Sequence, residues 1–113
     1  MQVVALTVPD SIELWLGSLR HSLEEAGVVV HFQRSPVDRP NPSCVVNLRR
    51  GNHEADLLAW ESGEGDLAVV GAAGSAPAIE HHDNLKNDER LSAVLVMMLQ
   101  AIDYPGPNGE SGV

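Results

Sequence analysis

The chain has 113 residues, of which 43% are hydrophobic, and a formal net charge of −9 at pH 7. This length and apolar content predict one folded domain, which we place at residues 1–104, followed by a flexible tail at 105–113. Seven lysines and arginines against sixteen aspartates and glutamates argue against a surface for nucleic acid or anionic membranes and indicate a basic protein partner.

The first predicted helix follows residues 2–8, a short β-branched run that we interpret as an edge strand or a lead-in. Pro9 ends this run, and Asp10 or Ser11 can cap the helix. Apolar residues then recur at three-and-four spacing: Ile12, Trp15, Leu16, Leu19, Leu23 and Ala26. Gly27 ends the helix. The opposite face is rich in glutamate, so we expect an amphipathic helix lying on a sheet.

Extended segments follow the helix. Residues 28–34, 44–48, 54–60 and 66–70 are rich in apolar or β-branched residues, and the first and third alternate between two faces. Three prolines make residues 35–43 a loop, because a proline removes a backbone donor. Gly51-Asn52 and the glycines at 63 and 65 supply two tight turns. Residues 78–82 extend briefly after a flexible glycine- and alanine-rich loop.

The second predicted helix is capped by Asn87 or Asp88. Its inner stripe consists of Leu91, Val94, Leu95, Met98, Leu99 and Ile102. Short links between consecutive strands favour antiparallel pairing. The predicted fold is therefore a two-layer α+β domain, an antiparallel β-meander of about four strands with an N-terminal and a C-terminal helix packed on one face. The other face is left exposed to solvent or to a partner.

Residues with catalytic or metal-binding chemistry are few. His81, His82 and Asp83 form the most ligand-like cluster, but adjacent residues of an extended segment point to opposite faces, which argues against chelation. Cys44 begins an apolar strand and is expected to be a buried, inert thiol; alone it forms neither a disulfide nor a Cys-based zinc site. We expect no enzyme activity, no catalytic residue, no metal and no cofactor.

Negative charge is concentrated between residues 54 and 89, where nine acidic residues and one lysine give a net charge of −8. A small acidic surface can dock a basic protein and accelerate the encounter. Large aromatic side chains are mostly buried, which favours Trp60 packed under a helix; alternatively, Trp60 anchors an interface. The candidate partner-binding residues are Asp56, Trp60, Glu61, Glu64, Asp66, His81, His82 and Asp83.

Several motifs together resemble those of one protein family. They are Trp15 in the first helix, Gly27 followed by three valines, Asn41-Pro42-Ser43 before a strand, and Leu58-Ala59-Trp60-Glu61-Ser62-Gly63 followed by Asp66-Leu67. Over residues 13–102 the chain resembles the TriTu family of bacterial immunity proteins, whose pattern also tends to place a histidine at the position of His82. The resemblance implies an antidote of a contact-dependent growth inhibition system rather than an enzyme. It also implies a tRNA-directed nuclease toxin, which can be found in a three-way complex with the immunity protein and elongation factor Tu.

Three hypotheses follow. The first is a cytoplasmic immunity protein that covers the basic substrate-binding surface of a cognate toxin's C-terminal nuclease domain, with or without elongation factor Tu. We base the cytoplasmic location on the lack of a basic leader and of a membrane-length apolar run. The second is a small metal- or ligand-binding domain that uses His81, His82 and Asp83. The third is a dimeric adaptor that pairs through an edge strand at residues 2–8.

Overall fold

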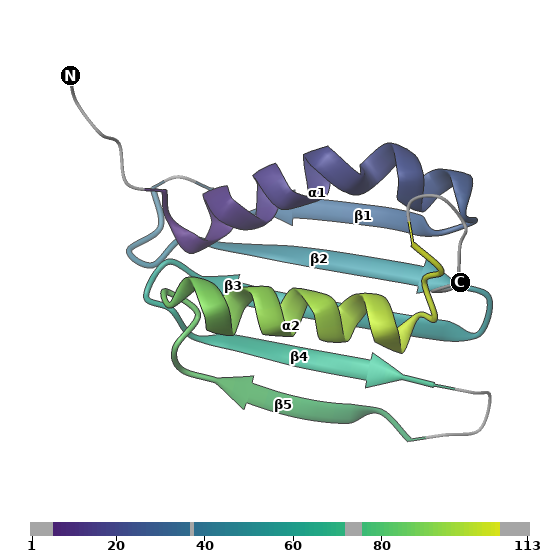
Figure 1. The fold of residues 1–113 in the computed structure, drawn as a ribbon. Helices are drawn as coiled ribbons and strands as arrows, with labels where there is room; N and C mark the ends of the chain where they lie inside the picture. Colours follow the sequence, from purple (N-terminus) through teal and green to yellow (C-terminus); the bar gives the residue numbers. More distant parts are fainter. Residues whose placement is uncertain (1–5, 37, 72–75, 107–113) are drawn as a thin grey trace.

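Two helices and an antiparallel sheet make up the computed structural model, which describes residues 6–36, 38–71 and 76–106. The elements in chain order are α1 (Val8–Glu25), β1 (Val29–Arg34), β2 (Ser43–Arg50), β3 (His53–Trp60), β4 (Gly65–Val70), β5 (Ala78–His82) and α2 (Asp88–Ala101). The strands pair in chain order, and both helices lie on the same face of the sheet (Figure 1). The predicted α+β class, the meander and the helix positions are confirmed.

The predicted meander of about four strands has one strand fewer than the five-stranded sheet of the structure. β5, expected only as a brief extension, pairs with β4 from Gly65 opposite His82 to Val69 opposite Ala78. Four of its five residues are exposed, on one face or the other. Neither face needs apolar residues, and the sequence of β5 therefore shows no apolar alternation. A strand that buries no face gives no periodic signal, so its pairing could not be read from its composition.

Helix α1 begins earlier than predicted, with Thr7 rather than Asp10 or Ser11 as its N-cap. The Asp10 amide donates to the Thr7 hydroxyl (3.2 Å), and the Thr7 amide donates to the Asp10 carboxylate (3.1 Å). This reciprocal capping box satisfies two backbone donors at the helix start. The edge-strand interpretation of residues 2–8 is wrong for residues 6–8, because Val8 belongs to α1. Residues 1–5, and residues 107–113 of the predicted tail, lie outside the described residues.

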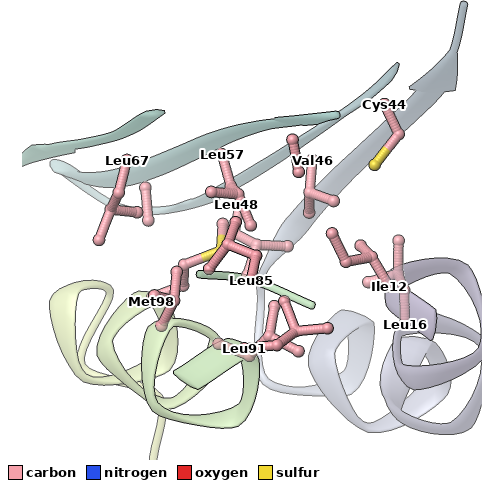
Figure 2. Packing of buried hydrophobic residues seen from close by; sticks show 14 of the residues in the cluster. Ile12, Leu16, Cys44, Val46, Leu48, Leu57, Leu67, Leu85, Leu91 and Met98 are labelled. Atoms are coloured by element: carbon pink, nitrogen blue, oxygen red, sulfur yellow. The ribbon is translucent and has the colours of Figure 1, made fainter. Parts of the chain in front are cut away.

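The core lies between the sheet and the two helices. Alternate residues of β2 and β3 are at most 1% exposed and face the helices: Cys44, Val46, Leu48, Ala55, Leu57 and Ala59. Figure 2 shows four of them, Cys44, Val46, Leu48 and Leu57, on the side of the sheet that faces Ile12 and Leu16 of α1 and Leu91 and Met98 of α2. Leu85, in the link between β5 and α2, closes the core and is 1% exposed. The predicted inner faces of both helices and the predicted alternation along β3 are confirmed.

Cys44 is part of this core and has no thiol partner among the described residues. Burial raises the pKa of its thiol to about 11. The thiol is therefore protonated and unreactive at neutral pH, as expected from its apolar surroundings. Within the described residues, no helix combines the length and the apolar content needed to cross a membrane.

Two glycine-to-alanine substitutions test this packing in opposite directions. A Cβ at Gly17, in the middle of α1, has no heavy atom within 4 Å, so Gly17→Ala should raise the free energy of unfolding by about 0.5–1 kcal/mol. A Cβ at Gly65 collides with the buried Leu85 side chain and lies 3.2 Å from the Leu58 carbonyl oxygen. Gly65→Ala should therefore lower the free energy of unfolding by about 1–3 kcal/mol. Urea unfolding followed by tryptophan fluorescence measures both, and changes of the same sign would contradict this packing.

Candidate partner-binding surface

The candidate surface lies on the face of the sheet that neither helix covers, which we call the open face. The strand register aligns its side chains in rows that cross the sheet. One row consists of Gln33, Val45, Leu58, Asp66 and His81, and the next of His31, Asn47, Asp56, Ala68 and Ile79. The first row is aliphatic in its middle and charged at β4 and β5. The open face therefore presents an apolar patch beside a charged corner.

Trp60 lies at the end of β3 on the open face, opposite Ser43 of β2. Its neighbour Ala59 is fully buried beneath the helices, so the alternation along β3 turns Trp60 to the other face. The side chain is half-exposed. Burial under a helix, which the residue type favours, is therefore wrong for Trp60, and its indole ring is accessible to a partner.

Asp56 is held on the open face by a hydrogen-bonded amide. The Asn47 amide nitrogen donates to the carboxylate of Asp56 (3.1 Å) and to that of Glu54 (2.7 Å). Asn47 lies opposite Asp56 on the neighbouring strand and thus reaches both acids. Two neighbouring carboxylates repel each other, and the shared amide donor offsets part of that repulsion. This role of Asn47 was not predicted from the sequence, because it depends on the register of β2 against β3.

The charged corner is built around His81. The strand register places Asp66 opposite His81, and the Nδ1 atom of His81 lies 2.6 Å from the Asp66 carboxylate. The Nε2 atom lies 2.7 Å from Asp83, just beyond the end of β5, and 3.9 Å from Glu64 in the β3–β4 turn. We call Glu64, Asp66, His81 and Asp83 the acidic corner. All but the half-exposed Asp66 are exposed.

His81 can donate to both neighbouring aspartates only when both ring nitrogens carry a proton. Hydrogen bonds to Asp66, and then to Asp83, raise the pKa of His81 above its usual value. Protonated His81 therefore neutralises part of the charge of the acidic corner. The corner remains negative, because it contains three carboxylates.

Two of the predicted partner-binding residues, His82 and Glu61, lie away from the acidic corner. His82 faces the opposite side of the sheet, where its ring lies 3.2 Å from Glu80, so the two adjacent histidines do not converge. Glu61 lines a pocket of about 430 Å³ together with Thr7 and Ser11 of the start of α1 and Asp88 of the start of α2. Of the eight candidate residues, the structure therefore gathers four into the acidic corner and places Asp56 and Trp60 elsewhere on the open face.

Three residues of the acidic corner can hold a divalent cation. One ligand atom from each of Glu64, His81 and Asp83 lies within 4.8 Å of the other two. Asp66 on the other ring nitrogen orients the imidazole, as carboxylates do for metal-binding histidines. All three candidate ligands are exposed, and water competes for each of them. Glu64 was not expected beside His81, because seventeen positions separate the two in the sequence.

The chain was compared with known proteins. The family model described as immunity protein TriTu matches residues 10–101. The chain belongs to the TriTu family. The match extends from the first turn of α1 through all five strands to the last residue of α2. Searches of curated proteins and of solved structures found no match.

Membership of the TriTu family confirms the resemblance seen in the sequence motifs. An immunity protein acts by neutralising a toxin, and the family is generally non-enzymatic. Family membership therefore implies a toxin as the partner of this TriTu member.

The ionisation of His81 in this TriTu protein should depend on its two aspartate neighbours. We expect a His81 pKa above the usual histidine value, lowered more by Asp66→Asn than by Asp83→Asn, because the Asp66 hydrogen bond contributes most. The raised pKa also means that this interaction stabilises the fold fully below about pH 6.5 and that the stabilisation is lost as pH rises through the folded-state pKa.

NMR titration of the imidazole measures the pKa, and urea unfolding of wild type and His81→Gln across the same pH range measures the stability difference. The difference should narrow as the pH rises. A His81 pKa that neither aspartate substitution lowers would contradict the contacts described above.

Proposed function

We propose that this immunity protein neutralises a basic nuclease toxin by covering the toxin's substrate-binding surface with the open face and the acidic corner. The observation behind this proposal is the position of the acidic corner, where three carboxylates gather on the face that neither α1 nor α2 covers. A nuclease that acts on tRNA must present lysines and arginines to the phosphates. The same cations are complementary to the carboxylates of Glu64, Asp66 and Asp83. We place this encounter in the cytoplasm, where tRNA is found.

The apolar patch beside the acidic corner suits a different part of the interaction. Val45, Leu58 and Trp60 are half-exposed and none belongs to the hydrophobic core. Charges at the rim of an interface mainly accelerate association, whereas buried aromatic and aliphatic contacts slow dissociation. We therefore assign the long lifetime of the complex to Trp60 and its aliphatic neighbours, and its rapid formation to the acidic corner.

Occupation of the toxin surface also excludes the substrate. Residues 54–89 have a net charge of −8. When docked, this segment repels RNA phosphates from the surface that it covers. Inhibition then needs no contact with the toxin's catalytic residues. Elongation factor Tu is not required for this mode of inhibition, and its effect is tested by adding it to the preformed complex.

Charge reversal at the acidic corner tests the proposal. We expect Glu64→Lys with Asp83→Lys to lower the association rate constant at low salt by about tenfold or more, because electrostatic steering is lost. The probe for this test is the C-terminal region of the polypeptide encoded immediately upstream of this gene. Stopped-flow mixing at low and moderate salt measures the rate, and protection of cells that express this region measures neutralisation.

The matched control is Glu24→Lys with Glu25→Lys, which changes the net charge equally at two exposed positions in the last turn of α1. We expect this control to reduce the association rate far less. Equal losses in the two double variants would show that net charge alone, and not the acidic corner, steers the toxin.

A metal-binding function is the second candidate, because ligand atoms of Glu64, His81 and Asp83 converge. This candidate predicts that titration of Zn²⁺ into metal-free protein shows one bound equivalent, lost in His81→Gln and kept in His82→Gln, since His82 faces the opposite side. Isothermal titration calorimetry measures both. Absence of zinc binding, or equal losses in the two variants, would remove this candidate and leave the toxin-binding proposal unaffected.

A further inference from the structure

Strand β5 lies outside the layer formed by the two helices. α1 packs on β1 and β3, and α2 packs on β3 and β4. Figure 1 shows β5 beyond α2 at the edge of the sheet. Ile79 on the open face is 72% exposed, and Ala78 and Glu80 on the other face are also exposed. β5 thus has solvent on both faces and no strand along its outer edge in the described structure.

A groove runs between β5 and α2 on the helix side of the sheet. It has a volume of about 310 Å³. Its walls are formed mainly by aliphatic side chains and Met97, which come from β4, β5 and α2: Leu67, Val69, Ala78, Met97 and Ala101. Ala78 is exposed and contributes only a methyl group to the wall of this groove. An apolar side chain placed beside Ala78 can enter it.

The two ends of β5 differ in charge. Ala78 and Ile79 make its first end apolar. Its C-terminal end is acidic, because Glu80 lies there on one face of the sheet and the acidic corner on the other. The Asp83 side chain in this corner is 72% exposed. A basic side chain beside Glu80 or His81 can reach carboxylates on either face. The edge therefore complements a segment that is apolar at one end and basic at the other.

We propose that an extended segment of the toxin pairs with β5 as a sixth strand, with apolar residues beside Ala78 and Ile79 and basic residues beside Glu80 and His81. A free strand edge presents a row of backbone donors and acceptors, which another strand satisfies directly. The added strand lies about 4.8 Å beyond β5, close enough for its side chains to reach both the groove and the acidic corner. This inference rests on the proposed function, because the toxin is the occupant.

The other edge of the sheet does not match such a segment. β1 contains no acidic residue. Its last residue, Arg34, is held over the start of α1 by Asp10 (2.9 Å) and Glu13 (3.0 Å). A basic segment therefore finds no complementary charge along β1. The same comparison supplies a matched control, because Val29 of β1 is a β-branched residue on the open face and 61% exposed.

The test compares Ile79→Lys with Val29→Lys. Both substitutions add one positive charge to an exposed position on an edge strand, so both leave the fold intact and change the net charge equally. We expect Ile79→Lys to weaken binding of the upstream-encoded toxin region by about tenfold or more, and Val29→Lys to change the dissociation constant less than about threefold. In the wild-type complex, hydrogen–deuterium exchange should slow at the amides of β5 and remain unchanged at those of β1.

The outcomes separate this inference from the function on which it rests. Tight toxin binding without protection of β5, or with equal losses in the two variants, would overturn strand addition while leaving toxin neutralisation intact. Absence of toxin binding by the wild-type protein would overturn both. Protection at β5 together with selective loss in Ile79→Lys supports the sixth strand.

Discussion

The alternation of side chains along β2 and β3, combined with the register between these strands, is the constraint on which the rest of the structure depends. Six alternate residues of these strands are buried to 1% exposure or less, and the positions between them face solvent. A shift of β3 by one residue against β2 would expose Ala55, Leu57 and Ala59 and bury Glu54 and Asp56 instead. Burying carboxylates without compensating partners is costly. The core therefore determines which acids reach the open face.

The exposure of β5 follows from the extent of the layer formed by the two helices. α1 and α2 lie side by side over β1 to β4, and β5 lies beyond α2 at the edge of the sheet. β5 is held by its pairing with β4 and by the contact of His81 with Asp66, both of which are close to solvent. Elements with few buried contacts are the ones that proteins use for binding, because they can rearrange at low cost. The least buried strand of this sheet is also the one beside its densest negative charge.

Much of the fold was predictable from the sequence, because periodic patterns report which side of an element is buried. Both helices and strands β1 and β3 have such patterns, whereas β2 and β4 were recognised as apolar runs and the turn at Gly51 by its residue types. The start of α1 was missed because Asp10 resembles an N-cap, although it is the third residue of the helix and closes a capping box that begins at Thr7. β5 was missed as a full strand because it buries no face and so has no pattern.

The candidate site was predictable as a set of residue types but not as an arrangement. Periodicity indicates the face on which a residue lies, whereas the row is set by the register between strands. Asp66 and His81 are fifteen positions apart and meet only through the β4–β5 register. The position of Trp60, by contrast, was indicated by periodicity, because the alternation along β3 already placed it on the face away from Leu57. The general preference of tryptophan for burial led to the wrong prediction.

Under the proposed binding mode, the acidic corner makes stability and toxin binding respond to pH in opposite directions. Below the raised pKa of His81, the protonated ring donates to Asp66 and Asp83, and this stabilises the junction between β4 and β5. The same positive charge offsets part of the negative charge of Glu64, Asp66 and Asp83, and so weakens the attraction for a basic partner. Above that pKa the ring is neutral, the junction loses this stabilisation, and the carboxylates attract cations more strongly. In the proposed complex, a cation of the toxin would take the place of the lost proton and restore the charge balance at the β4–β5 junction.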